Sequence, residues 1–359
     1  MSFTLTPAAL ASALVLAQAA PSQIAADLIA ETGSPGAAAA RECGSGYEEG
    51  VAGVRIAGQD TPIRTGDLWH MGSNTKAMTA TLAARLVEQG VIDWTTTINE
   101  GLSGLELTIA EDLRGATLEN LLSHRAGMKA NAGLITALRL QGEDSRRDVQ
   151  ADRVVYARAV LGEPGGPIGD YLYSNAGYVI AALMMETAAG APYEALMTRE
   201  VFAPLGMDVA GWGPPGDSGE DDQPRGHDGA PFGGLDAKEP GPGADNPPAM
   251  NPAGRAHMPL SDLTAFLLAH RDQPESYLSA QSWARLQTPA ADGDYALGWG
   301  VRGDGALVHA GSNTLWFARM RIDRPDGCVL AVAVNDGRID TVSAPVNAAL
   351  DALALSEAR

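Results

Sequence analysis

Ser73 and Lys76 carry the strongest chemical signal in the sequence, a Ser-x-x-Lys motif near the start of a predicted helix over residues 71–90. Side chains three residues apart lie on one face of a helix. A serine hydroxyl becomes a good nucleophile when a base takes its proton, and a lysine is that base only as the neutral amine, which burial favours. The apolar residues of this helix spread around most of its circumference and indicate burial. We therefore interpret the pair as nucleophile and base rather than as a capping serine beside a solvated lysine.

Tyr173, Ser174 and Asn175 form a second, weaker signal directly before a predicted helix over residues 175–190. A phenol can relay a proton when a nearby cation stabilises the phenolate, and an amide side chain can both donate to and accept from a substrate amide. Taken alone, this segment is read more simply as a helix cap beside a packed tyrosine.

His309, Ala310 and Gly311 end a predicted strand. A glycine at a strand end lets a ligand approach the backbone, and the next N–H group, that of Ser312, could face an oxyanion. Alone, the histidine is read more simply as an ordinary strand residue.

The three motifs occur in the order Ser-x-x-Lys, Tyr-x-Asn and His-x-Gly, about 100 and 135 residues apart. In this combination the chain resembles the serine beta-lactamase and penicillin-recognising superfamily. It is most similar to the class C beta-lactamase-like branch, which includes D-Ala-D-Ala carboxypeptidases, D-aminopeptidases and family VIII carboxylesterases. The segments LWHMGSNTKAMTA, LLSHRAGM and LGWGV add to the resemblance, which covers about residues 23–350.

The resemblance implies that Ser73 attacks a carbonyl carbon and forms an acyl-enzyme, while Lys76 and Tyr173 share the proton transfers. It implies no cofactor. The six histidines lack the close spacing typical of zinc ligands, which argues against a metal-dependent hydrolase.

The resemblance also implies the binding groups. Asn175 would position the amide or acyl side chain of the substrate, and His309 and Gly311 would line the opposite wall. The backbone N–H groups of Ser73 and Ser312 would form the oxyanion hole.

The sequence departs from class C beta-lactamases at residues 309–311, where those enzymes carry Lys-Thr-Gly. The lost cation is expected to hold a substrate carboxylate and to lower the pKa of the tyrosine, so an esterase or peptidase is favoured over penicillin hydrolysis. Leu315 and Trp316 stand where many relatives have glycine, and we expect them to narrow the acyl pocket. Arg125 replaces a small hydroxyl residue, and we interpret His124 as structural.

These observations favour a serine hydrolase acting on an ester or on a D-amino-acid amide or peptide, of the esterase or D-Ala-D-Ala carboxypeptidase type. Two alternatives stay open: a beta-lactamase proper, and a non-catalytic penicillin-binding or sensing protein on the same scaffold. The expected partner is a small-molecule or peptide substrate, and the oligomeric state stays open.

Composition narrows the class of protein. The 359 residues carry 25 Lys and Arg against 44 Asp and Glu, a formal net charge of −19. Such a field repels phosphate backbones and anionic lipids, so nucleic-acid binding is not expected. No apolar run reaches the roughly 18 residues of a membrane span, so membrane insertion is not expected either. Cys43 and Cys328 fall in predicted strands from opposite chain ends; they could be neighbours, but free buried thiols are our interpretation.

Strand patterns at both chain ends, with helices between them, predict an α/β (α+β) fold of the beta-lactamase/transpeptidase type. We expect an antiparallel sheet lobe from residues 23–90 and 286–359, flanked by helices, with a mostly helical lobe inserted over residues 91–285. Residues 211–252 predict a long loop that borders the cleft and selects substrate.

The N-terminus has two interpretations. Residues 1–22 contain an apolar stretch and a small-x-small pattern typical of a signal peptide, but Thr6 and Pro7 could equally begin a first helix. The signal-peptide interpretation predicts a periplasmic or secreted protein, and the alternative a cytoplasmic one.

Overall fold

The computed structural model describes residues 20–141, 148–230, 233–290, 292–324 and 327–355. The possible signal peptide or first helix before residue 20 therefore lies outside the described residues. The first described helix is α1, Pro21–Thr32, which ends at Gly33 in the left-handed conformation.

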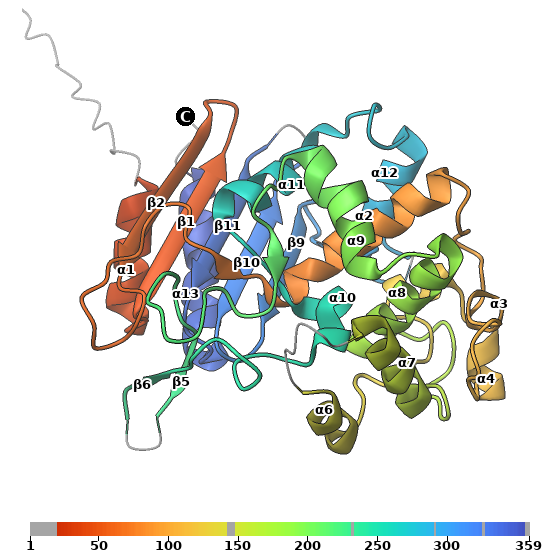
Figure 1. The fold of residues 1–359 in the computed structure, drawn as a ribbon. Coiled ribbons are helices and arrows are strands. Elements are labelled where there is room, and N and C mark those ends of the chain that lie inside the picture. Colours follow the sequence, from red (N-terminus) through yellow and green to blue (C-terminus); the bar gives the residue numbers. More distant parts are fainter. Residues whose placement is uncertain (1–19, 142–147, 231–232, 291, 325–326, 356–359) are drawn as a thin grey trace, which may run out of the picture.

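A six-stranded antiparallel sheet is built from both ends of the chain, in the order β2-β1-β11-β10-β9-β8 (Figure 1). Its strands are β1 (Gly36–Glu42), β2 (Tyr47–Gly53), β8 (Gly300–Val301), β9 (Leu307–Ser312), β10 (Phe317–Ile322) and β11 (Val329–Val334). Strands β1 and β11 are buried on both faces, which explains why β11 consists of apolar residues alone and why β1 begins with a run of glycine and alanines before Arg41 and Glu42. The predicted sheet from two chain ends is confirmed.

Each face of the sheet is covered by helices. Alternate residues of β11 divide between two apolar clusters, because successive side chains of a strand point to opposite faces. One face packs against α1 and α13 (Ile339–Leu355), and the other against α11 (Leu260–Asp272). Helix α11 packs on the sheet, although it falls within residues 91–285, the range expected to form the helical lobe. The division into lobes stays a prediction.

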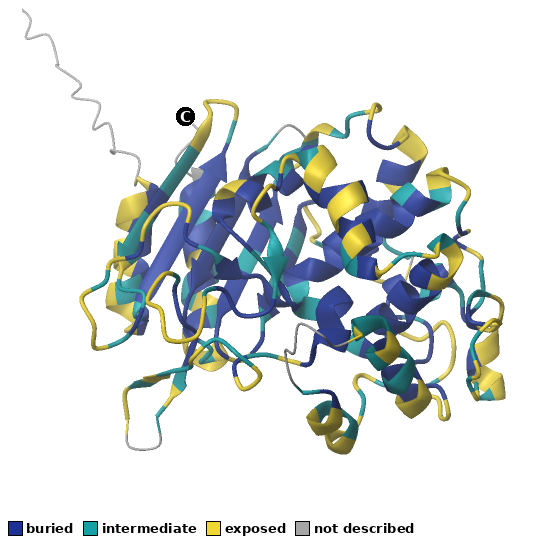
Figure 2. Ribbon diagram, viewed as in Figure 1, coloured by how far each residue is buried: buried dark blue, intermediate teal, exposed yellow. Residues whose placement is uncertain are grey.

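Two buried helices stand beside the sheet. Helix α2 (Thr75–Glu88) follows a short 3-10 turn, η1 (Gly72–Asn74), and α8 (Asn175–Ala189) packs against it. Figure 2 shows both helices dark blue along most of their length, in agreement with the burial expected from their apolar sequences.

The remaining helical segments surround α2 and α8. They are α3 (Ile98–Gly101), α4 (Glu111–Arg114), α5 (Leu118–Leu122), α6 (Leu134–Leu140), α7 (Val149–Val160), α9 (Tyr193–Met197), η2 (Thr198–Phe202), η3 (Ala203–Leu205), η4 (Pro248–Met250), α10 (Asn251–Gly254) and α12 (Ala280–Gln287).

The remaining short strands form two smaller sheets. β7 (Ala256–Met258) pairs with both β3 (Trp69–His70) and β4 (Gly211–Trp212), and a separate hairpin joins β5 (His227–Gly229) to β6 (Leu235–Ala237). Because β3 ends two residues before η1, its pairing fixes where the Ser-x-x-Lys turn begins.

Cys43 and Cys328 are paired in a disulfide, so the interpretation as free thiols is wrong. The antiparallel register of β1 against β11 places Glu42 opposite Val329, and it therefore brings Cys43, the residue after Glu42, next to Cys328, the residue before Val329. The bond therefore closes the N-terminal hairpin onto the strand from the C-terminal part.

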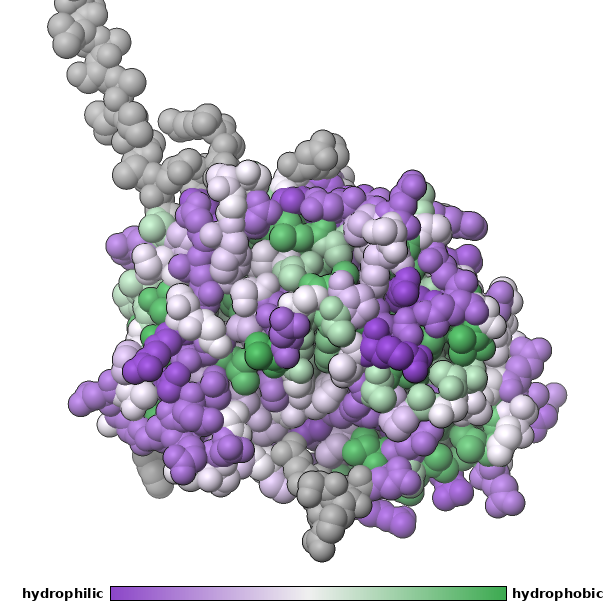
Figure 3. All heavy atoms as spheres, turned by 45° about the horizontal axis from the view of Figure 1, so that its top comes forward, coloured by the Kyte–Doolittle hydropathy of each residue, from purple (hydrophilic) through white to green (hydrophobic). Residues whose placement is uncertain are grey.

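Hydrophilic residues predominate on the face shown in Figure 3, and apolar side chains gather there only in small groups. No helix within the described ranges is both long and apolar enough to cross a bilayer.

Candidate active site

Ser73 and Lys76 meet where η1 continues into α2. The Ser73 Oγ and Lys76 Nζ atoms are 3.0 Å apart, and the Lys76 side chain is fully buried. Burial disfavours the ammonium form and places the pKa of Lys76 well below its ordinary value. The side chain is therefore suited to act as a base.

Lys76 has two further neighbours, the side-chain oxygen of Asn175 at 2.7 Å and the carbonyl oxygen of Ala253. Neither oxygen can donate a hydrogen bond. A neutral amine has two N–H groups and one lone pair, so donating to these two oxygens leaves the lone pair for the Ser73 hydroxyl. This geometry allows Ser73 O–H to donate to Nζ, which is the arrangement needed for proton transfer.

Tyr173 lies beside this pair, where the Ser73 side chain favours the phenolate form. Burial is the largest cause of a raised pKa for Tyr173, to about 12, and the Ser73 side chain opposes it. Lys76 Nζ lies 4.9 Å from the centre of the Tyr173 ring. At neutral pH the phenol is protonated, so it can donate a proton rather than accept one.

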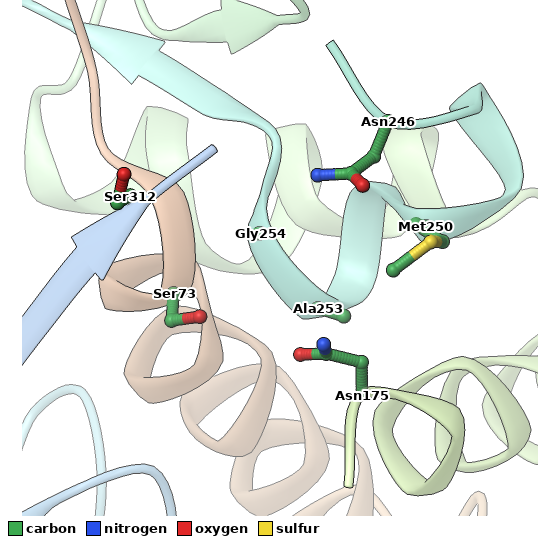
Figure 4. A pocket seen from close by; sticks show the side chains of 7 residues that line it. All are labelled: Ser73, Asn175, Asn246, Met250, Ala253, Gly254 and Ser312. Atoms are coloured by element: carbon green, nitrogen blue, oxygen red, sulfur yellow. The ribbon is translucent and has the colours of Figure 1, made fainter. Parts of the chain in front are cut away.

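Asn175 is placed by the start of α8, where the Ser174 hydroxyl accepts the N–H of Gly177 as a helix cap. Its amide nitrogen donates to Asn131 at 2.8 Å while its oxygen faces Lys76. In Figure 4 the Ser73 hydroxyl and the Asn175 amide oxygen point toward each other.

A pocket opens in front of Ser73 (Figure 4). Its lining consists of Ser73, Asn175, Asn246, Met250, Ala253, Gly254 and Ser312. A larger cavity of about 420 Å³ shares part of this lining and extends toward α6. Asn246 and Met250 lie in the segment over residues 211–252, which was expected to be one long loop but contains β4, β5, β6 and η4. That this segment selects substrate stays a prediction.

The end of β9 lies against η1, the turn that carries Ser73. A Cβ atom on Gly311 would stand 2.6 Å from the Ser73 nitrogen, and one on Gly72 would stand 2.3 Å from the Ser312 nitrogen. Gly72 also has a positive φ of 50°. Glycine at both positions therefore lets two backbone N–H groups come together at the pocket, as an oxyanion hole requires.

His309 lies on β9, where its ring contacts Tyr295 rather than lining the pocket at Ser73. Its Nε2 atom is 3.1 Å from the Tyr295 hydroxyl, and its Nδ1 atom is 2.9 Å from the Ala310 carbonyl oxygen. Burial lowers the pKa of His309 to about 3, so the ring is neutral. Neither His309 nor Gly311 is among the described residues that line the pocket at Ser73, and their contact with substrate stays a prediction.

Leu315 and Trp316 do not narrow the pocket. They form a small buried cluster with Ala244, away from both cavities in the described part of the chain. The chain turns at Thr314, whose φ is 73°, and this turn directs the two side chains behind the site.

His124 is buried and accepts the N–H of Ser174 at 3.0 Å, with its ring 4.2 Å from that of Tyr173. This placement agrees with a structural role. Sequence reasoning overlooked Asn131 and Asn246, which lie in irregular segments without a periodic pattern. Among the described residues no group of three or more side chains is arranged to hold a metal ion.

The fold and this site define a protein of the beta-lactamase/transpeptidase type. The chain belongs to the beta-lactamase family, whose model matches residues 22–355.

It is 28% identical to penicillin-binding protein 4 of Amycolatopsis lactamdurans over 336 residues, which cover 84% of this chain and 81% of that protein. It is 29% identical to the unguisins hydrolase ungD of Aspergillus violaceofuscus over 169 residues, 45% of this chain and 29% of that protein. The fold is similar to that of the D-amino acid amidase of Ochrobactrum anthropi SV3, with a TM-score of 0.74, 22% identity, and coverage of 94% and 98% of the two chains. Family and relatives support a serine hydrolase type of activity.

Proposed function

We propose that this protein is a serine hydrolase that forms an acyl-enzyme on Ser73 and cleaves an ester or a D-amino-acid amide or peptide. The observation that carries the proposal is the buried Lys76, whose Nζ lies 3.0 Å from the Ser73 oxygen and also contacts oxygens of Asn175 and Ala253. As a neutral amine, Lys76 can donate to the last two oxygens and accept the Ser73 proton. A base in this state needs no prior loss of a proton to bulk water.

In the acylation step the Ser73 proton moves to Lys76 Nζ as Oγ bonds to the substrate carbonyl carbon. The carbonyl oxygen becomes an oxyanion that accepts hydrogen bonds from the Ser73 and Ser312 N–H groups. The phenol of Tyr173 gives its proton to the leaving alcohol or amine, and the bond to the leaving group breaks. The Lys76 ammonium then returns a proton to the phenolate.

Deacylation runs the same transfers with water. Lys76, which is neutral again after acylation, accepts a proton from the water as the water oxygen attacks the acyl carbon. The Ser73 oxygen leaves and regains a proton from the Lys76 ammonium. One water is consumed, and one carboxylic acid is released.

The residues that line both cavities favour a substrate with an uncharged group next to the scissile bond. The described residues that line them are uncharged, and amide side chains of Asn131, Asn175 and Asn246 face the same space. An amide lining favours an acyl group that carries its own amide or carbonyl. The motif at residues 309–311 lacks the lysine that would hold a carboxylate, so we place efficient penicillin hydrolysis second.

We also propose that the protein works in an oxidising compartment, either periplasmic or secreted. The disulfide between Cys43 and Cys328 supports this, because such bonds persist outside the reducing cytosol.

The direct test is covalent labelling followed by intact mass. A fluorophosphonate should add one label to the wild-type chain, and peptide mapping should place it on Ser73. Ser73→Ala should take up no label, while Ser103→Ala, which removes an exposed serine, should label like the wild type. An unlabelled wild-type chain under forcing conditions would exclude an acylating Ser73.

A substrate panel then separates the finer types. We expect turnover of p-nitrophenyl butyrate or of a D-amino-acid amide to exceed turnover of nitrocefin. A penicillin adduct on Ser73 that forms without turnover of any of these substrates would favour the binding or sensing protein instead.

A further inference from the structure

A buried carboxylate lies directly behind the oxyanion hole. The side chain of Asp245 is only 1% exposed and accepts hydrogen bonds on both oxygens. Oδ2 accepts from His70 Nε2 at 2.8 Å and from Arg255 Nε at 3.0 Å. Oδ1 accepts from Asn313 Nδ2 at 3.0 Å and from the Asn246 backbone N–H at 2.8 Å. A single side chain thus joins its own segment to His70 and Asn313, which are 175 and 68 residues away in the sequence.

Asp245 is connected to the site by two branches of hydrogen bonds. The first branch runs through His70 to η1, the turn that carries Ser73. The Gly72 N–H donates to Nδ1 of His70 at 3.1 Å, so the ring must carry its proton on Nε2, where it donates to Asp245. Asp245 therefore fixes both the tautomer and the orientation of His70. Because Gly72 directly precedes Ser73, the ring holds the peptide unit next to the one that presents the Ser73 N–H group.

The second branch leads to the end of β9. Asn313 follows Ser312, and its side-chain oxygen accepts the N–H groups of Leu315 and Trp316, each at 3.2 Å. Its amide nitrogen donates to Asp245, which fixes the amide orientation that this turn needs.

The two branches also touch each other, because the His70 and Trp316 rings stack at 5.4 Å with an angle of 22° between their planes.

We propose that Asp245, acting through His70 and Asn313, is the positioning residue that holds the Ser73 and Ser312 N–H groups in the geometry of the oxyanion hole. The inference rests on the proposed function and adds residues that neither the Ser-x-x-Lys nor the Tyr-x-Asn motif contains. A direct role for His70 as a base is excluded by its contacts, since the ring is fully buried and both nitrogens are engaged.

Arg255 offsets the free-energy cost of burying the Asp245 carboxylate, because it supplies a paired positive charge. Its guanidinium is almost fully buried, bonds to Asp245, and also donates to the Asn251 side chain at 2.7 Å. Asn251 begins α10, the short helix whose Ala253 carbonyl accepts from Lys76. The same network therefore supports the wall that contacts the proposed base as well as the oxyanion donors.

The test compares changes in single branches with a change in the shared carboxylate. His70→Gln removes the acceptor for the Gly72 N–H and keeps a donor toward Asp245. We expect kcat to fall about 10²-fold, since a misplaced oxyanion donor is worth about that much, with KM changed less than threefold. Asn313→Ala should have a similar effect. His70→Asn restores an acceptor near the position of Nδ1 and should recover at least about tenfold of the lost kcat.

Backbone amide NMR of Ser73 and Ser312 gives a readout that does not depend on turnover. His70→Gln should move the Ser73 amide signal and Asn313→Ala the Ser312 signal, whereas Asp245→Asn should move both. If wild type turned over no substrate, these signals would still decide the inference while the proposed function failed.

The matched control is His270→Gln, because His270 is equally buried but bonds to Thr81 on the far part of α2. It should lower stability without moving either amide signal or kcat. The inference is overturned if folded Asp245→Asn leaves both amide signals in place. It is also overturned if the His70 and Asn313 variants lose stability but keep the wild-type kcat, as the control is expected to do. Should Asp245→Asn not fold, unchanged amide signals in both branch variants would overturn it equally.

Discussion

Lys76 and Arg153 are both fully buried cations, yet the structure surrounds them differently. Arg153 bonds to the carboxylates of Glu186 and Glu194. Lys76 contacts a hydroxyl, an amide oxygen and a backbone carbonyl, and no carboxylate in the described part of the chain forms an ion pair with it. A buried charge is stable when it is paired, whereas an unpaired lysine loses its proton instead. The contrast separates a structural cation from a group available for proton transfer.

The largest effect should come from removing the unpaired lysine. Lys76→Met keeps the length of the side chain but removes the base, so we expect kcat to fall about 10³-fold or more. The change is measured by steady-state kinetics on the best substrate of the panel. Lys129→Met is the control, because Lys129 is a surface lysine paired with Glu163, and it should leave kcat unchanged. Wild-type kcat in Lys76→Met would end the assignment of Lys76 as base.

Removing the paired cation should instead cost stability. Arg153→Met leaves the fully buried carboxylate of Glu186 and the partly buried carboxylate of Glu194 without their cation, and burial already raises the pKa of Glu186. We expect the free energy of unfolding to fall by about 3–5 kcal/mol in urea denaturation. Arg285→Met breaks a half-exposed pair with Glu119 and should cost about 1 kcal/mol or less. Equal losses in the two variants would remove the distinction between buried and surface pairs.

Much of the scaffold was open to prediction because its patterns are local. The Ser-x-x-Lys spacing and the apolar circumference of α2 are properties of one segment, and so is the cap at Ser174. The strand patterns at both chain ends indicated a common sheet.

What escaped prediction depends on contacts between distant segments. His70 and Asp245 are 175 residues apart, and Asp245 lies in a loop without periodicity. The pairing of Cys43 with Cys328 depends on the exact register of β1 against β11, which strand patterns do not give. A shift by one residue would have pointed the two thiols to opposite faces.

The contrast between the two cations can be sharpened by giving Lys76 a carboxylate. In Asn175→Asp a carboxylate replaces the amide oxygen 2.7 Å from Nζ, which stabilises the ammonium and raises the pKa of Lys76. Because the neutral amine is the base, the acidic limb of the kcat/KM profile should move to higher pH, by about 1–3 pH units.

The control is Asn131→Asp, one hydrogen bond farther from Lys76, which should move the limb less. If the acidic limb of the Asn175→Asp profile stays at the wild-type pH and only the maximal kcat/KM falls, then the limb does not report the titration of Lys76.

The smallest effect is a difference in how stability depends on pH. An unfolded lysine has a pKa near 10.4, whereas burial holds the pKa of Lys76 well below its ordinary value. Between these two values the unfolded chain binds more protons than the folded chain, so wild-type stability rises with pH. Lys76→Met lacks this contribution. Across pH 8, 9 and 10, wild type should therefore gain stability relative to Lys76→Met by up to about 1.4 kcal/mol per pH unit in urea denaturation. Other titrating groups are common to both proteins and cancel in the difference. Parallel curves would show that Lys76 keeps its proton in the folded protein, as an ion-paired cation does, and the distinction from Arg153 would be lost.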